Sequence, residues 1–412
     1  MRILLLTDNY PPESNPPALR CSMHAKHWIA RGHHVNVVTS FPNFPDGMVF
    51  GGYHQSLYKR ETLGTVDVLR VPTLIFPNRA IFLRIVDFLS FMVTSCIASF
   101  FVGRPDVVLA TSPQFFTAVT GWFVSRVYRR PFVFEIRDLW PDSIVAIGVM
   151  KEGRAIRLIR MVEQFLYRKA ELIVTVTSSS RDILIKRGID ADKIIVVTNG
   201  IDTGQMTPGP APAELRRCLG LENKIVVSYI GTVGMAHGLQ LILDAAQDCR
   251  IRLPEVHFMI VGSGAELRDL QQQASERGLG NVTFVGRVEH GDIASYWHLS
   301  DITLVLLKDI PLFRTVIPSK IFEAMATGTP IITNVRGELQ TLLEPLGTAE
   351  IIEPSSLKAL VDAIEKLVRD PARRQALSAA SAKAALQYDR IALADKLLDA
   401  LIATVSRQGT DR

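Results

Sequence analysis

Short runs of β-branched and aliphatic residues alternate with helix-length segments along the whole chain of 412 residues. This alternation is typical of parallel sheets whose two faces are covered by helices. In the first half we expect strands at 3–6, 35–39, 66–71, 107–110, 132–136, 173–176 and 194–197. In the second half we expect them at 225–230, 257–261, 282–285, 302–306 and 331–333. The sequence therefore predicts an α/β fold made of two doubly wound, Rossmann-like lobes.

The length of the chain indicates two domains, because 412 residues with 48% apolar composition exceed one ordinary core. We expect an N-terminal domain at 1–200, a linker at 201–212 where turn-forming residues replace the apolar pattern, and a C-terminal domain at 213–387. A last amphipathic stretch, 388–412, is expected to form a helix that crosses back to the first domain. Two such lobes facing a central cleft bind ligands at the carboxyl ends of their strands.

The segment 317–330, which reads IPSKIFEAMATGTP, has the chemistry of an anion site. Pro318 and Ser319 resemble a helix start, with Ser319 able to cap free backbone N–H groups and Lys320 in the first turn. A helix N-terminus with an adjacent ammonium attracts phosphate. Glu323, one turn further on, is placed to accept hydrogen bonds from sugar hydroxyls, so the segment indicates a sugar-nucleotide site.

Three further loops follow predicted strands and carry unusual composition. They are residues 8–17, with four prolines and the acceptor-side candidates Glu13 and Asn15, residues 137–142, with Arg137 and Asp138, and residues 231–238, with Gly231, Thr232 and Gly234. The glycines of the last loop allow close approach of backbone to a phosphate. These loops are where we expect substrates to bind.

Charge is distributed unevenly along the chain. Residues 1–200 hold 24 Lys and Arg against 16 Asp and Glu, whereas the remainder holds 22 against 25. This asymmetry favours an anionic partner for the first lobe, either a lipid headgroup surface or a phosphorylated acceptor. A nucleic-acid partner is not expected, because the chain has no reader motif for one.

Two segments of the first lobe indicate contact with a membrane surface. Residues 88–102 contain no charge but are too short to cross a bilayer, which takes about 20 residues. Packing on the sheet is favoured for them over a membrane-dipping helix. Residues 151–169 place basic side chains among apolar ones, a pattern that also fits a solvated helix face; five of them are Arg154, Arg157, Arg160, Arg168 and Lys169. Together they predict a peripheral protein on the inner face of the cytoplasmic membrane.

Neither a cofactor nor a metal is expected. The four cysteines have no CxxC spacing, which fits a reducing cytoplasm, and the first apolar run is too short for a signal peptide. The D-x-D match at 190–192 lies at a helix end, where acidic turn residues are common. His24, His27, His33 and His34 cluster without a convincing ligand set.

An ordered series of motifs covers nearly the whole chain. It runs from YPPE through RGHHVNVVT, DVVLATSP, FEIRDLWPDS, VVTNGID, YIGTVGMAHGL, MIVGSG and FVGR to PSKIFEAMATGTPII. This series resembles that of the retaining family-four glycosyltransferases of the GT-B fold. IRDLWP and IPSKIFEAMA further resemble the bacterial branch that builds O-antigen and colanic-acid polysaccharides, such as L-fucosamine transferases.

The resemblance implies that the second lobe holds the donor nucleotide and the first lobe the acceptor. It implies that Glu323 binds the ribose, that Arg287 and Val288 hold the base, and that Gly231 to Gly234, Pro318, Ser319 and Lys320 surround the diphosphate. Arg137 and Asp138 are candidates for contacting the donor sugar or orienting the acceptor, with Lys320 as a third catalytic candidate.

The chain departs from the family pattern at several of these positions. Thr315 stands where a second glutamate is common, Thr232 and His237 occupy the loop that often carries an Arg and a Lys, and Arg137 replaces a histidine. Arg137, Arg314 and Lys320 are expected to supply the missing positive charge for a departing diphosphate. The change at Thr315 is consistent with a deoxy or acetamido sugar.

The predicted activity is transfer of a sugar from a nucleotide diphosphate to a polyprenyl-diphosphate-linked saccharide, with UDP favoured over GDP. The resemblance implies same-face attack without a protein nucleophile, in which the departing phosphate takes the proton. Two alternatives stay open from the sequence. They are a sugar-nucleotide 2-epimerase and a catalytically degenerate subunit of a polysaccharide assembly complex.

Overall fold

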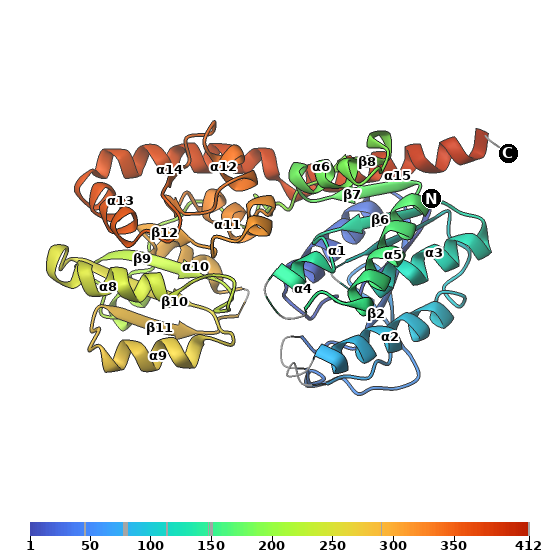
Figure 1. Ribbon diagram of the computed structural model, residues 1–412, viewed down its shortest axis with the longest axis horizontal. Coiled ribbons are helices and arrows are strands. Elements are labelled where there is room, and N and C mark those ends of the chain that lie inside the picture. The colour runs from blue at the N-terminus through green and yellow to red at the C-terminus, as the bar shows by residue number, and fades with distance from the viewer. Residues whose placement is uncertain are drawn as a thin grey trace. The chain divides into compact units, whose positions relative to one another are not determined.

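The computed structural model describes residues 1–44, 47–76, 81–112, 114–146, 148, 151–289 and 291–410. The chain forms two compact units (Figure 1). Unit 1 contains Met1–Thr198 and Arg390–Arg412, and unit 2 contains Asn199–Asp389. Each unit is a parallel sheet with helices on both faces, which confirms the predicted α/β fold class.

The sheet of unit 1 has eight strands in the order β3-β4-β2-β1-β5-β6-β7-β8. The strands are β1 (Arg2–Leu6), β2 (His34–Ser40), β3 (Lys59–Leu63), β4 (Val66–Val71), β5 (Val107–Thr111), β6 (Phe132–Ile136), β7 (Leu172–Thr175) and β8 (Ile194–Val196). All neighbours are parallel except β3, which pairs antiparallel with β4 at the edge. The sequence did not predict β3, because its residues KRETL lack the apolar run of a buried strand.

Helices cover both faces of this sheet. They are α1 (Pro16–Ala30), α2 (Ile81–Ala98), α3 (Phe116–Tyr128), α4 (Asp142–Ala146), α5 (Arg154–Lys169), α6 (Ser178–Lys186) and α15 (Arg390–Thr410). Successive side chains of a strand point to opposite faces. Accordingly, Ile3 and Leu5 of β1 join the core beneath α1 and α15, whereas Leu4 and Leu6 join the core beneath α2 and α3.

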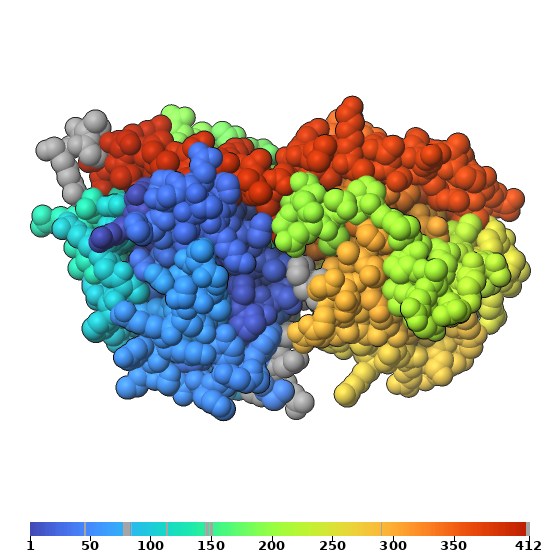
Figure 2. Space-filling model, turned by 180° about the vertical axis from the view of Figure 1, so that it is seen from behind, coloured from blue at the N-terminus to red at the C-terminus, as the bar shows by residue number. Residues whose placement is uncertain are grey.

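The last helix completes the first unit. The indole Nε1 of Trp28 in α1 donates a hydrogen bond to the carbonyl of Ala394 in α15 at 2.9 Å. Leu397 and Leu401 of α15 are fully buried in the same core as the first strand. In Figure 2 the red atoms of this helix lie against the blue atoms of the N-terminal residues. Segments from the two ends of the chain therefore share one core.

The sheet of unit 2 has six parallel strands in the order β11-β10-β9-β12-β13-β14. The strands are β9 (Ile225–Ile230), β10 (Val256–Val261), β11 (Val282–Gly286), β12 (Ile302–Val305), β13 (Ile331–Thr333) and β14 (Ala349–Ile351). Its helices are α7 (Ala213–Cys218), α8 (Gln240–Arg252), α9 (Leu267–Glu276), α10 (Ile293–Leu299), α11 (Lys320–Thr327), α12 (Glu338–Leu343), α13 (Leu357–Arg369) and α14 (Pro371–Ala385). The short edge strand β14 was not predicted, since three half-buried residues carry no periodic signal.

Helix α2 contains most of the uncharged segment. Phe91 and Ser95 are fully buried, and Phe91 belongs to the core of the sheet, so the predicted packing of this segment on the sheet is confirmed. Among the residues that the structure describes, no helix is both long and apolar enough to cross a membrane.

A buried ion pair joins the first helix to the centre of the sheet in unit 1. Arg20 of α1 contacts Glu135 of β6 at 2.9 Å, and both residues are almost fully buried. Burial alone raises the pKa of the Glu135 carboxyl, but the Arg20 guanidinium outweighs it and the pKa falls to about 2. Arg20 also donates to the carbonyls of Val197 and Thr198. The pair therefore fixes the end of the chain segment that leaves unit 1.

Replacement of Arg20 by methionine is expected to lower the free energy of unfolding of unit 1 by about 3–5 kcal/mol, because Glu135 would remain buried without its partner. Urea denaturation followed by circular dichroism measures this change. The matched control is Arg31→Met, which removes an exposed ion pair with Asp395 at 3.1 Å and should cost about 1 kcal/mol or less. Equal effects of the two substitutions would contradict the structural role assigned to Arg20.

Candidate functional site

The loops that follow β9 and β10 lie backbone against backbone at the carboxyl edge of the sheet in unit 2. The amide of Gly231 donates to the carbonyl of Val261, and the amide of Val233 to that of Ser263, each at 2.9 Å. Gly262 has φ +137°, and a Cβ on it would lie 1.9 Å from the carbonyl oxygen of Gly231. The close approach therefore requires glycine at this position. The sequence contained this signal in the motif VGSG, but the motif is too common to identify a site by itself.

Lys320 brings a positive charge to this pair of loops. It is the first residue of α11 and is 9% exposed, and its Nζ lies 3.8 Å from the centre of the Tyr229 ring. A Cβ on Gly231 would lie 2.8 Å from this Nζ, so the ammonium sits directly against the glycine loop. Among the described residues no hydrogen-bond acceptor reaches the Nζ. The Tyr229 hydroxyl in turn donates to the carbonyl of Thr232 at 2.6 Å.

The electrostatics of this site favour an anionic ligand. Burial lowers the pKa of the Lys320 ammonium to about 7. Burial, together with the charge of Lys320, lowers the pKa of His237 to about 4, so this imidazole is neutral at pH 7. Its Nδ1 lies 3.3 Å from the carbonyl oxygen of Leu306. A buried cation of this kind gains most from a ligand that brings its own negative charge.

Glu323 lies in the first turn of α11 and is held by a neighbouring helix. The indole Nε1 of Trp297 in α10 donates to Oε2 of Glu323 at 3.1 Å, and Trp297 is fully buried. A buried tryptophan fixes the carboxylate because the indole has no freedom to turn away. Sequence reasoning missed the roles of Trp297 and Tyr229, which are recognised only from their contacts.

The prediction that the Ser319 side chain caps α11 is wrong. Ser319 occupies the position before the helix with φ −59° and ψ −28°, and its side chain makes no capping bond to the described amides. A side-chain cap requires an extended backbone at that residue. Here the chain turns earlier, and the amides of Ile321 and Phe322 donate to the carbonyls of Pro318 and Ser319.

Three other donor-side candidates lie in separate places in unit 2. Arg287 and Val288 directly follow β11, the strand next to β10, with Arg287 exposed and Val288 half-buried. Arg314 lies in a short 3-10 turn and forms an ion pair with Asp309 at 3.0 Å. The Asp309 carboxylate therefore reduces the positive charge that Arg314 can offer to a departing diphosphate.

Arg137 and Asp138 follow β6 at the carboxyl edge of the sheet in unit 1. The amide of Arg137 donates to Ser112 Oγ at 2.8 Å, whereas its buried Nη1 has no hydrogen-bond partner in the part of the chain described. The Asp138 side chain is exposed, and its carbonyl accepts a bond from the amide of Trp140 at 3.0 Å. This loop combines a guanidinium nitrogen that lacks a described acceptor with an exposed aspartate.

The acceptor-side candidates Glu13 and Asn15 serve the structure of unit 1. Glu13 is 2% exposed, and its carboxylate accepts bonds from the amides of Asn43 and Phe44 at 2.9 and 2.8 Å. Asn15 caps α1, with its Oδ1 accepting from the amide of Ala18 at 3.0 Å. The carboxylate of Glu13 and the Oδ1 of Asn15 therefore hold backbone amides of unit 1, and their place on the acceptor side stays a prediction.

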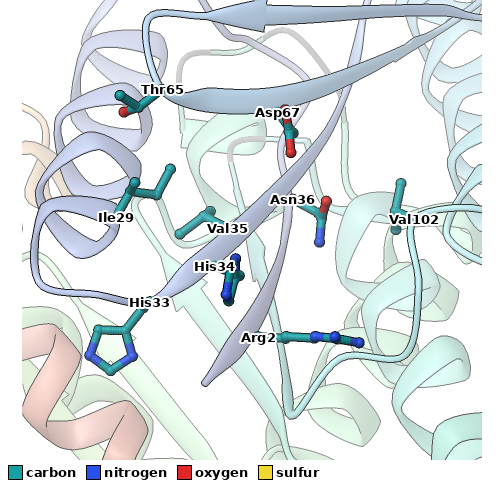
Figure 3. A pocket seen from close by; sticks show the side chains of 9 residues that line it. All are labelled: Arg2, Ile29, His33, His34, Val35, Asn36, Thr65, Asp67 and Val102. Atoms are coloured by element: carbon teal, nitrogen blue, oxygen red, sulfur yellow. The ribbon is translucent and has the colours of Figure 1, made fainter.

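Two other features of the sequence lie apart from these loops. Asp190 accepts a bond from the amide of Asp192 at 3.0 Å and so caps the short 3-10 turn Ala191–Lys193. A small pocket of about 180 Å³ contains Arg2, His33 and His34 (Figure 3), but it lies at the amino ends of β1 and β2. In the described ranges no three His, Cys, Asp or Glu side chains are grouped to hold a metal ion.

Replacement of Gly262 by alanine is expected to weaken UDP binding by at least about tenfold, because the new Cβ must displace the loop at Gly231. Isothermal titration calorimetry measures the affinity. The matched control is Gly280→Ala in the same unit, where a Cβ meets no described atom within 4 Å. Unchanged UDP affinity in folded Gly262→Ala protein would exclude these loops from the nucleotide site.

Binding of UDP is also expected to depend on pH through Lys320. The ammonium is protonated below its pKa of about 7, and a bound diphosphate favours that form. Affinity should therefore be highest below pH 7 and fall by up to about tenfold per pH unit above it. Titrations between pH 6 and 9 test this, and Lys320→Met separates the lysine from ionisation of UDP itself. An identical pH dependence in the variant would contradict the assignment.

Two sequence families match consecutive parts of the chain. The family described as glycosyl transferase 4-like domain matches residues 17–200, and that described as glycosyl transferases group 1 matches residues 213–384. The first therefore covers most of unit 1, and the second covers the part of unit 2 that carries Lys320 and Glu323.

Individual proteins show the same likeness. The chain is 27% identical over 382 residues to the putative colanic acid biosynthesis glycosyl transferase WcaI of Escherichia coli (strain K12), covering 90% of this chain and 93% of that protein. It is 23% identical over 268 residues to the probable glycosyltransferase WbjE of Pseudomonas aeruginosa, covering 64% and 66% of the two chains.

Among solved structures, HepE of Anabaena in complex with UDP and glucose superimposes with a TM-score of 0.75 at 20% identity. The match covers 98% of this chain and 100% of that one. The chain is therefore a glycosyltransferase of the GT-B fold, with a glycosyl transferase 4-like domain followed by a glycosyl transferases group 1 domain.

Proposed function

We propose that the protein transfers a sugar from a UDP-sugar to a polyprenyl-diphosphate-linked saccharide during assembly of a bacterial surface polysaccharide. The observation that carries this proposal is the buried Lys320 ammonium beside the glycine loop of β9, which no described acceptor reaches. A diphosphate supplies the missing negative charge. The likeness to WcaI, which is named as a putative colanic acid biosynthesis glycosyl transferase, supports the polysaccharide context.

The donor is proposed to bind in unit 2. Its diphosphate contacts Lys320 and the backbone of residues 231–234, where a buried cation and close-packed glycines favour phosphate oxygens. Its ribose contacts Glu323, whose carboxylate Trp297 already holds. Its base lies near Arg287 and Val288 at the end of β11. UDP as the nucleotide is supported by the UDP bound to HepE, a protein of the same fold.

The chemical step is proposed to retain the anomeric configuration without a protein nucleophile. The bond between the sugar C1 and the leaving phosphate oxygen breaks, and the acceptor oxygen forms a bond to C1 on the same face. The departing diphosphate takes the acceptor proton, and protonated Lys320 stabilises its charge. No metal is required in this scheme, because the lysine and backbone amides serve the role that a cation serves elsewhere.

The acceptor is proposed to bind in unit 1. Arg137 has a buried Nη1 that lacks a described acceptor, and Asp138 beside it is exposed, so the pair offers both a cation and a carboxylate to a phosphorylated saccharide. A lipid-linked acceptor places the protein at the inner face of the cytoplasmic membrane as a peripheral protein. Thr315, where the family often has a glutamate, favours a deoxy or acetamido sugar as the transferred group.

The alternatives from the sequence have less support. The comparisons give no support to a 2-epimerase, since the matched relatives are named as transferases. A degenerate subunit would not need to keep a buried cation at the donor loops, where its desolvation is costly.

Titration of wild type and Glu323→Ala with UDP and GDP tests the donor assignment. Wild type is expected to bind UDP more tightly than GDP, and the variant to bind UDP at least about tenfold more weakly, because a charged hydrogen bond to the ribose is lost. Glu323→Gln is the matched variant, since it keeps a polar partner for Trp297. Turnover of a UDP-sugar is then assayed with and without a polyprenyl-diphosphate-linked acceptor. Folded wild-type protein that binds neither nucleotide would overturn the proposal.

A further inference from the structure

Helix α5 of unit 1 carries apolar side chains on its exposed side as well as on its buried side. Its exposed stripe contains Leu158, Met161 and Phe165, of which Leu158 and Met161 are 61% and 70% exposed. Its inner side buries the carboxylate of Glu163, which the Tyr167 hydroxyl and the Arg187 guanidinium approach. A helix in contact with water on its outer side normally carries polar side chains there. The outer side of α5 is therefore suited to an apolar environment.

The neighbouring helices α2 and α3 extend this apolar stripe. On α2 the side chains of Leu89, Val93 and Ile97 recur every four residues and are exposed, and Phe101 follows them. Phe123 and Val127 of α3 are exposed in the same way. These residues occur on helices that cover one face of the sheet, as the shared core beneath them shows.

Aromatic contacts join the three stripes into one surface. The rings of Phe100, after α2, and Tyr128, in α3, lie 5.6 Å apart, and those of Trp122 in α3 and Phe165 in α5 lie 5.0 Å apart. The helices pack side by side on one side of the sheet in unit 1 (Figure 1). We call this surface the apolar face, defined by Leu89, Val93, Ile97, Phe100, Phe101, Phe123, Val127, Leu158, Met161 and Phe165.

Basic side chains border the apolar face. Arg154, Arg157, Arg168 and Lys169 are exposed on α5, and Arg126 is exposed between Phe123 and Val127 on α3. The acidic group that α5 carries, Glu163, points inward and is buried. An apolar surface with a basic border complements the acyl chains and anionic headgroups of a bilayer, and a protein partner would not require this excess of positive charge.

We propose that the apolar face docks unit 1 onto an anionic phospholipid bilayer, with the apolar side chains entering the headgroup boundary and the basic border contacting lipid phosphates. The inference rests on the proposed membrane-linked acceptor and assigns the surface that reaches it. It uses none of the residues placed in the donor site.

Co-sedimentation with vesicles tests the docking surface. Wild-type protein is expected to bind vesicles of phosphatidylcholine with 30% phosphatidylglycerol and to bind pure phosphatidylcholine at least about tenfold more weakly. The variant Val93→Gln/Ile97→Gln/Leu158→Gln/Met161→Gln should lose at least about tenfold in binding to the anionic vesicles, because four side chains no longer enter the lipid. Arg157→Gln should bind the anionic vesicles about fivefold more weakly than wild type. This difference in binding should become smaller at high salt, because salt screens the attraction between the arginine and the lipid phosphates.

The control variant is Ile251→Gln, which changes an apolar side chain that is 81% exposed on α8 of unit 2 and should bind vesicles as wild type does. UDP binding by each variant confirms that the protein is folded. Wild-type vesicle binding by the fourfold variant would overturn the docking surface and leave a membrane-bound acceptor possible by another surface. If wild-type protein binds neither the anionic nor the pure phosphatidylcholine vesicles, both the docking surface and the membrane-bound acceptor are overturned. If wild-type protein forms a concentration-dependent dimer that the fourfold variant does not form, and the two bind vesicles equally well, the apolar face serves self-association instead.

Discussion

The direct contact between the loops after β9 and β10 is the constraint on which the candidate site of unit 2 depends. Because the two backbones touch, there is no room for a side chain at Gly262, and the amides of residues 231–234 lie at the carboxyl edge of the sheet. Lys320 then extends over Tyr229 to reach the same place from α11. The hydroxyl of Tyr229 donates to the carbonyl of Thr232, and its ring lies against the Lys320 ammonium. One residue therefore positions both the glycine loop and the lysine.

In unit 1 the main constraint is that charged side chains are buried in the core and need partners there. Arg20 and Glu135 neutralise each other, and Glu13 is satisfied by backbone amides of a neighbouring loop. These contacts leave Arg137 and Asp138 as polar groups at the sheet edge that are not consumed by packing. Charge inside the unit is therefore paired or hydrogen-bonded, whereas the buried Nη1 of Arg137 at its edge has no partner among the described residues.

Sequence reasoning reached the fold class, because buried parallel strands such as Ile225–Ile230 are continuous apolar runs that stand out between helices. It failed at the edge strands β3 and β14, which are polar or very short. At the candidate site, the position of Lys320 and Glu323 in the first turn of a helix was predicted because helix-start signals are local in sequence. The contacts of Trp297 and Tyr229 were missed because they depend on partners distant in the chain. The burial of Glu13 was not predicted because no local pattern encodes it.

The position of α15 has a consequence for the order in which the protein folds during synthesis. Unit 2 is one continuous stretch and can assemble its sheet as soon as its own residues have left the ribosome. Unit 1 begins first but lacks Leu397 and Leu401 of its core until the last helix is made. The apolar surface of α1 that awaits α15 therefore stays uncovered through most of translation. The side of α1 that packs on α15 therefore reaches its folded environment only after Leu397 and Leu401 have left the ribosome.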